Sequence, residues 1–131
     1  MEMLEIETRS KIDFQEVTQR IKGVVDSCGI KNGLCQIFVP HTTAGITVNE
    51  HADPSVVKDI TECLDRLVPQ LFNYHHKEGN APAHIKASLV GNSLTLLIEN
   101  GRIVLGTWQG IFLCEFDGPR QRHIAVNIIK A

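Results

Sequence analysis

The sequence predicts one α+β domain, residues 1–131, in which mostly antiparallel, sandwich-like sheets are covered by two helices. Segments with alternating or continuous apolar residues, typical of strands, occur before, between and after two segments with helical apolar spacing. An Asn-Gly pair, the strongest short hairpin signal, joins two of the later strand-like segments. The resulting order, β-α-β-β-α-loop-β-β-β-β, is typical of antiparallel sheets with helices packed on their faces.

The first strand is predicted at residues 4–9, where apolar and charged residues alternate and leave one face to water. Asp13 is placed to cap a helix, with Glu16 three residues later as in a capping box. Apolar residues at helical spacing follow as far as Cys28, and Gly29 is a suitable residue to end the helix. We therefore expect the first helix to begin after Asp13.

Two further strands are predicted at residues 33–39 and 46–50, with a polar bend between them. The second helix is expected to begin after Asp53 as N-cap, with Pro54 in its first turn. It ends before Pro69, since proline cannot continue a helix.

A polar loop rich in His, Gly, Asn and Pro is predicted at residues 74–84. From residue 85 onward the apolar pattern favours strands again, and residues 100–101 are the Asn-Gly turn. The remaining strands are expected at residues 93–98, 103–105, 111–116 and 122–129. A loop of this composition between patterned segments is a place to look for chemistry.

Composition excludes several classes of function. The net charge of −2 and the seven aromatic residues among 131 disfavour nucleic-acid binding. No apolar run approaches the roughly 20 residues that a membrane helix needs. The chain opens without a secretory signal, so we expect a cytoplasmic protein whose four cysteines are buried free thiols.

Histidines are the first candidates for chemistry. His41 follows a strand, His75 and His76 enter the polar loop, and His84 leaves it. Three imidazoles with an open fourth position are typical of a catalytic zinc site, here assembled from separate segments. The alternative is that these are loop histidines hydrogen-bonded to backbone or water. Because adjacent residues of an extended chain point to opposite sides, at most one of the two neighbouring histidines would be a ligand.

Polar residues on the bend and the strand after it form a second group. Thr42 and Thr43 are suited to hold an anion or a carbonyl group, or simply to form the hydrogen bonds of a tight turn. Asn49 follows on the polar face of the next strand. Glu50 is a candidate general base, or a carboxylate that favours the nearby helix N-terminus.

The C-terminal half contributes a third group. Trp108, between two glycines, is suited to stack on a flat heteroaromatic ligand or to fill a core or interface. Glu115 lies in an apolar strand and needs a partner, and Arg120 or Arg122 can provide one. The arginines are equally the residue type that binds phosphate with two parallel hydrogen bonds.

Several blocks together resemble the YjbQ family. They are residues 40–50 (PHTTAGITVNE), 74–76 (YHH) with 79–80 (GN), 83–84 (AH), 100–102 (NGR), 105–111 (LGTWQGI), and Glu115 with 119–120 (PR). The resemblance covers nearly the whole chain, and the His-Thr-Thr-Ala and Gly-Thr-Trp-Gln-Gly blocks are specific in combination.

The resemblance implies a homotrimer and a secondary thiamine-phosphate synthase activity. It also implies a divalent metal held by His41, His76 and His84, since the Tyr-x-His pattern selects the second loop histidine, and zinc is the metal that suits three imidazoles. The other positions that it implies, together with two from the residues themselves, are Thr42, Thr43, Asn49, Glu50, Trp108, Gln109, Glu115, Arg120 and Arg122.

Two functions are consistent with these residues. The first is a metal-dependent enzyme, a transferase or hydrolase, acting on a small phosphorylated heteroaromatic substrate. Glu50 and Glu115 are then the catalytic candidates, and Trp108, Gln109 and the arginines contact substrate. The second is a non-catalytic trimeric module that binds a ligand or a metal.

Overall fold

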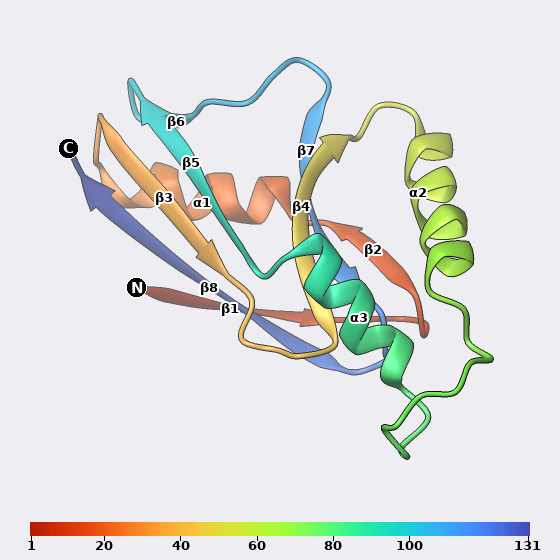
Figure 1. The fold of residues 1–131 in the computed structure, drawn as a ribbon. Coiled ribbons are helices and arrows are strands. Elements are labelled where there is room, and N and C mark those ends of the chain that lie inside the picture. The colour runs from red at the N-terminus through yellow and green to blue at the C-terminus, as the bar shows by residue number, and fades with distance from the viewer.

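Two antiparallel sheets and three helices make up the computed structural model, which describes residues 1–131 (Figure 1). The five-stranded sheet has the order β1-β8-β3-β5-β6, and the three-stranded sheet the order β2-β7-β4. The strands are β1 (Glu2–Glu7), β2 (Asp13–Glu16), β3 (Gly33–Phe38), β4 (Ala44–Glu50), β5 (Ser93–Glu99), β6 (Arg102–Ile103), β7 (Gln109–Glu115) and β8 (Gln121–Lys130). The helices are α1 (Thr18–Cys28), α2 (Pro54–Leu67) and α3 (Ala81–Val90). The predicted combination of helices with antiparallel sheets is confirmed, but three helices are present rather than two.

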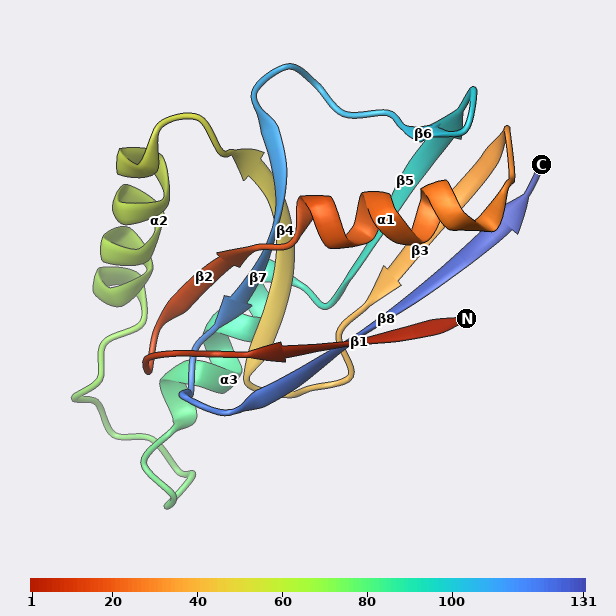
Figure 2. The ribbon, with the colours of Figure 1, turned by 180° about the vertical axis from the view of Figure 1, so that it is seen from behind.

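The main core lies between α1 and the sheets. One buried apolar cluster contains Ile21 and Val25 of α1, Ile37 of β3, Ile111 of β7 and Val126 of β8. Figure 2 shows α1 crossing one face of the five-stranded sheet, whereas in Figure 1 the opposite face of β3 and β5 carries no helix. One face of the larger sheet is therefore covered and the other is not.

A smaller apolar cluster lies on the three-stranded sheet. Ala83 and Ala87 of α3 pack on Phe112 and Phe116, and Leu64 of α2 contacts this cluster from outside. The buried residues along α3 therefore fix this helix against the sheet, whereas α2 has no fully buried residue.

The beginning of the first helix was predicted wrongly. Asp13 does not cap a helix, because residues Asp13–Glu16 form β2 and pair with β7, Phe14 opposite Cys114. The helix begins at Thr18, and no side chain caps it. Pairing with a buried central strand outweighs the capping pattern, which is a weak local preference. Its predicted end is confirmed, since Gly29 has the left-handed conformation, with φ of 72°.

The helix α3 was missed. Residues 81–84 were expected in a loop and residues from 85 onward in a strand, but residues 81–90 belong to α3. Pro82 lies in the first turn, where a missing N–H costs nothing, and alanines supply strong helix propensity. The apolar residues of this segment follow a helical period only when Ala83 and Ala87 are counted as core residues. Because both side chains are small, the sequence does not mark them as core positions. His84 consequently projects from a helix.

Several local predictions are confirmed. Asp53 caps α2 by accepting a hydrogen bond from Ser55 N–H at 2.9 Å, and the helix ends before Pro69. Asn100 and Gly101 both have positive φ, 54° and 78°, as the hairpin turn between β5 and β6 requires.

The four cysteines are free, as predicted, but only two of them are buried. Cys35 and Cys114 lie in the core, whereas Cys28 and Cys63 are exposed on helices. Burial, with a smaller contribution from Cys28, raises the pKa of Cys35 to about 11, so this thiol stays protonated at neutral pH. No helix combines the length and apolar character needed to cross a bilayer.

Gly45 allows α3 and β4 to approach each other. A Cβ atom at this position would lie 2.7 Å from the carbonyl oxygen of Gly91, at the end of α3. Replacing Gly45 by alanine is expected to lower the free energy of unfolding by about 1–3 kcal/mol, as overpacking does elsewhere. Urea denaturation measures this change.

Gly23 provides the matched control. It lies inside α1, and a Cβ atom there would have no neighbour within 4 Å. Gly23→Ala is expected to raise the free energy of unfolding by about 0.5–1 kcal/mol, because alanine favours the helix. If the Gly45→Ala protein were as stable as the Gly23→Ala protein, α3 and β4 would not approach each other closely at Gly45.

Candidate functional site

A cavity of about 310 Å³ opens where the bend between β3 and β4 meets α3. His41 and Thr42 come from the bend, and His84 and Ser88 lie one helical turn apart on α3. The full lining is His41, Thr42, Ala44, His84, Ala87, Ser88 and Asn92. Two of the three predicted histidines therefore line one cavity, although 43 positions of sequence, 41 to 84, separate them.

His41 is held in one orientation by the neighbouring strand. The backbone N–H of His123 donates to its Nε2 at 2.9 Å, and the two imidazole rings stack with centroids 6.1 Å apart. Burial lowers the pKa of His41, and the nearby positive charge of Arg122 acts in the same direction. The ring is thus neutral at neutral pH, and because Nε2 accepts, its proton lies on Nδ1. His41 is a hydrogen-bond donor through Nδ1.

His76 lies next to His84. Their ring centroids are 5.1 Å apart and the rings are nearly perpendicular, at 79°. His76 is also 3.9 Å from the carboxylate of Glu78. It does not line the cavity shared by the other two histidines.

The three histidines do not fit a metal ligand set in this conformation. No group of three or more His, Cys, Asp or Glu side chains is arranged to hold an ion. His41 would first have to release the hydrogen bond from His123, since its Nδ1 carries the proton while that bond exists. The zinc site at His41, His76 and His84 stays a prediction.

A buried polar network supports the bend from behind. Arg122 donates from Nε to Glu115 Oε1 at 2.8 Å and from Nη2 to Thr43 Oγ1 at 2.8 Å. Thr8 donates to the same carboxylate oxygen at 2.7 Å. The side chains of Glu115 and Arg122 are 0% and 3% exposed, and neither lines the cavity. The catalytic role predicted for Glu115 and the substrate contact predicted for Arg122 stay predictions. The position of the two side chains fixes Thr43 and hence the bend.

Arg120 is placed differently from Arg122. It is exposed and binds Asp117 twice, through Nη2 to the carboxylate at 3.0 Å and through Nε to the carbonyl at 2.9 Å. Asp117 also accepts a hydrogen bond from Asn80, the residue that precedes α3. Arg120 is therefore part of a link between the turn before β8 and the beginning of α3.

The remaining predicted residues lie at the other end of the small sheet. Glu50 pairs with Gln109, whereas Ala44, beside the cavity, pairs with Glu115 at the opposite end of β4. Seven residues of strand separate these ends by about 20 Å. The residues of this second group are Asn49, Glu50, Trp108 and Gln109, and they share no cavity with His41 in one chain.

The second group has its own local structure. Trp108 is 63% exposed, and its carbonyl accepts from His51 N–H at 2.9 Å. Gln109 Oε1 accepts from Gly106 N–H at 2.8 Å and so closes the tight turn before β7. The indole is left free to contact a ligand or another chain.

Comparisons with known proteins agree with this architecture. The model of the UPF0047 protein YjbQ-like family matches residues 2–131. The chain belongs to the YjbQ-like family. A UPF0047 protein of Methanocaldococcus jannaschii is 50% identical over 125 residues, covering 95% of this chain and 91% of that protein. YugU of Bacillus subtilis is 46% identical over 130 residues, with 98% of each chain covered.

Solved structures of the family have the same fold. A YjbQ/UPF0047 protein from Clostridium acetobutylicum superposes with a TM-score of 0.96 at 49% identity, covering 98% of this chain and 100% of that one. A protein from Sulfolobus solfataricus, described as being of unknown function, gives 0.95 at 35% identity, covering 99% and 96%. The YjbQ-like fold is thus shared along the whole chain.

The contact between His51 and Glu16 of this YjbQ-like chain was not predicted from the sequence. His51 Nδ1 and Glu16 Oε2 are 2.7 Å apart, and Thr18 donates to the same carboxylate oxygen at 2.7 Å. A Cβ atom at Gly110 would lie 2.6 Å from this oxygen, so the glycine of the Trp-Gln-Gly block makes room for the pair. The sequence pattern places Glu16 in a helix cap, and only the pairing of β2 with β7 brings it to His51.

The Glu16 carboxyl makes stability depend on pH. Burial alone would raise its pKa, but the hydrogen bonds of Thr18 and His51 and the charge of His51 outweigh burial and lower the pKa below 4.5. At a pH between the pKa of Glu16 in the folded chain and its pKa in the unfolded chain, the unfolded chain binds more protons. The stability that the ionised Glu16 contributes is therefore complete above about pH 4.5 and is lost as the pH falls below it.

Urea denaturation at pH 5.5 and pH 3.5 tests this. We expect the wild-type chain to lose more stability over this interval than Glu16→Gln, which has no carboxyl to titrate. Glu62→Gln, an exposed substitution on α2, is the control and should lose as much as wild type. Equal losses in all three proteins would contradict the assigned pKa direction.

Proposed function

We propose that the cavity between His41 and His84 is the active site of an enzyme that acts on a small phosphorylated heteroaromatic compound. Thiamine-phosphate synthase is the specific activity proposed, because the family resemblance implies it. The supporting observation is that His41, Thr42 and His84, from a strand bend and a helix, line one cavity of about 310 Å³. That volume is within the usual size of small-molecule sites.

The side chains in the cavity supply donors and one proton-transfer group. His41 donates from Nδ1, and the hydroxyls of Thr42 and Ser88 add further donors suited to phosphate oxygens. His84 is the group available to move a proton, because an imidazole ring has one nitrogen that donates and one that accepts. The buried pair Glu115 and Arg122 keeps His41 and Thr42 in place through Thr43.

A divalent metal, with zinc as the first candidate, remains part of the proposal as an untested cofactor. His84 and His76 are of the ligand type that zinc prefers. Since the three histidines do not form a ligand set in this conformation, no step of the chemistry is derived through a metal. Metal analysis of the purified protein, by mass spectrometry, is the direct measurement.

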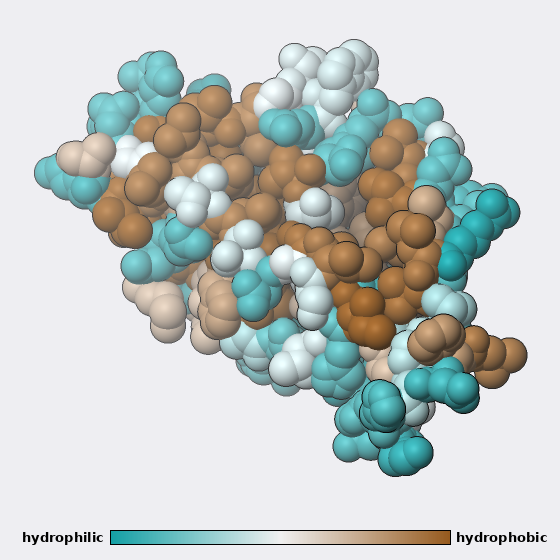
Figure 3. Space-filling view, in the orientation of Figure 1, coloured by the Kyte–Doolittle hydropathy of each residue, from teal (hydrophilic) through white to brown (hydrophobic).

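Assembly into a homotrimer is proposed for two reasons. The open face of the five-stranded sheet exposes Leu34 beside Leu97 and Ile129, and Phe38 further along the same sheet. In Figure 3 hydrophobic residues spread widely over the side of the molecule on which this face lies. Patches of this kind on a single chain mark interaction surfaces. A trimer also offers a way for Trp108 of one copy to reach the cavity of another.

The activity assay combines the pyrimidine pyrophosphate and thiazole phosphate precursors and measures thiamine phosphate. His84→Ala is expected to lower kcat by about 10²–10⁴-fold, as the loss of a general acid–base group does. His75→Ala is the matched control, since this histidine is exposed and has no place in the cavity, and it should leave kcat unchanged. Absence of activity in wild type, or an unaffected His84→Ala, would refute the proposal.

The exposed apolar sheet face also favours a second candidate, a non-catalytic trimeric module that binds a ligand or metal. The same variants separate the two. If His84→Ala dissociates the oligomer while turnover persists, the histidine is an assembly residue and the module is the better description.

A further inference from the structure

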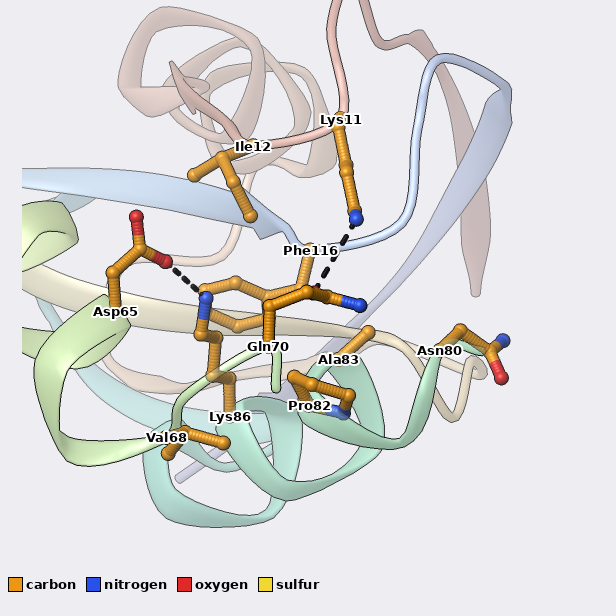
Figure 4. A pocket seen from close by; sticks show the side chains of 10 residues that line it. All are labelled: Lys11, Ile12, Asp65, Val68, Gln70, Asn80, Pro82, Ala83, Lys86 and Phe116. Carbon is orange, nitrogen blue, oxygen red and sulfur yellow. Dashed lines mark hydrogen bonds and ion pairs between the residues drawn. The ribbon is translucent and has the colours of Figure 1, made fainter. Parts of the chain in front are cut away.

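A second cavity, of about 380 Å³, lies between α2, α3 and the turn that joins β1 to β2. It shares no lining residue with the cavity of His41 and His84, so a ligand bound here would be independent of the proposed function. Figure 4 shows two lysines approaching this space, Lys11 from the β1–β2 turn and Lys86 from α3. Apolar walls are supplied by Ile12, Val68, Pro82 and Phe116.

Lys86 is unusually deep for a lysine. Its side chain is 7% exposed, whereas the side chain of Asp65, its ion-pair partner on α2, is 59% exposed. Asp65 accepts from the ammonium, and no other protein group does, so two of the three N–H donors lack a protein acceptor. Burying a charge is costly unless its hydrogen bonds are made. The ammonium therefore needs further acceptors, and the adjoining cavity is where they can bind.

Lys11 adds a second positive charge. Its Nζ makes one long hydrogen bond, 3.4 Å, to Gln70 Oε1 and no ion pair. Figure 4 shows Lys11 coming from above the Phe116 ring and Lys86 from below it, and both line the cavity. The charged residues that line the cavity are Lys11, Lys86 and Asp65, which leaves one net positive charge.

We propose that this cavity binds a small monocarboxylate with an apolar, ring-sized body. The carboxylate accepts from Lys86 and Lys11, which makes charge-assisted hydrogen bonds. The apolar body lies against Phe116, Pro82, Val68 and Ile12. One net positive charge matches a monoanion better than a phosphate dianion, and the cavity volume suits a ligand of this size.

The competing explanation is that Lys86 only joins α2 to α3 through Asp65. An ion pair that only links the two helices needs neither Lys11 nor an apolar wall. Removal of Lys11 would then have no effect on the binding of a carboxylate. The two explanations differ in whether a carboxylate binds and in whether both lysines matter to that binding.

The experiment titrates benzoate into the full chain and follows backbone amide chemical shifts. Saturable shifts are expected at residues lining the cavity, such as Val68 and Ala83, and a higher melting temperature should accompany them. Benzamide, which has the same shape and no charge, and inorganic phosphate, which has no apolar body, should cause neither. Shifts centred on Thr42 and Ser88 instead would place the anion in the other cavity and overturn this assignment.

Three variants make the test decisive. Lys86→Met should abolish benzoate binding, and Lys11→Gln, at an exposed position that leaves the fold intact, should weaken it about tenfold. Lys77→Gln, in the exposed loop before α3, is the control and should bind as wild type does. The proposal fails if wild type does not bind benzoate, if Lys11→Gln binds it equally well, or if phosphate binds in its place.

Discussion

Replacing Glu115 by alanine is expected to lower the free energy of unfolding by about 3–5 kcal/mol, the largest loss of stability predicted for this chain. Glu115 is fully buried and accepts hydrogen bonds from Thr8 and from Arg122, whose own side chain is 3% exposed. Removing the carboxylate leaves the guanidinium charge inside the protein without its partner. The penalty for that unpaired charge, rather than the strength of the pair itself, makes the loss large.

Urea denaturation followed by circular dichroism gives this value, and two variants show its origin. Glu115→Gln keeps the shape but loses the charge, so it should also destabilise, though less than alanine. In the double variant Glu115→Leu with Arg122→Met, neither charge of this pair remains in the interior, and much of the stability should return. If the double variant were as unstable as Glu115→Ala, packing rather than charge would explain the loss.

The sequence predicted most strands correctly because their signals are local. The apolar pattern of residues 93–98 and the Asn-Gly turn define β5 and its hairpin without any knowledge of distant residues. The two errors, β2 and α3, depend on long-range packing. Asp13 resembles a helix cap until β7 pairs with it, and Ala83 resembles a loop residue until Phe112 lies against it.

The candidate site was predictable in its residues but not in their arrangement. His41 and His84 are marked by the motif blocks, and they do line one cavity. Nothing in the sequence says that Nε2 of His41 accepts from the backbone of His123, which decides where the proton of the ring lies. Nor does a motif reveal that Trp108 is about 20 Å from that cavity along the strand. The blocks shared with the family identify residues but do not give the distances between them.

Leu97→Asp is expected to convert the proposed trimer into monomers. Leu97 is 60% exposed and lies opposite Leu34 on the uncovered sheet face, so in one chain the aspartate would remain in water and the core would be unaffected. In a trimer that buries this face, an unpaired carboxylate costs about 3–5 kcal/mol per interface, a factor of about a hundred to several thousand in affinity. Analytical ultracentrifugation at micromolar concentration measures the change.

Leu71→Asp is the matched control, because Leu71 is also a highly exposed leucine, at 92%, but lies in the segment after α2, away from the five-stranded sheet. It should leave the oligomer intact. If both variants remain trimeric, or if wild type is a monomer, the open sheet face is not the interface. If Leu97→Asp is a folded monomer, its turnover tests the assembly of the site. A site completed by Trp108 of another copy should lose activity on dissociation, whereas one confined to His41 and His84 of a single chain should keep it.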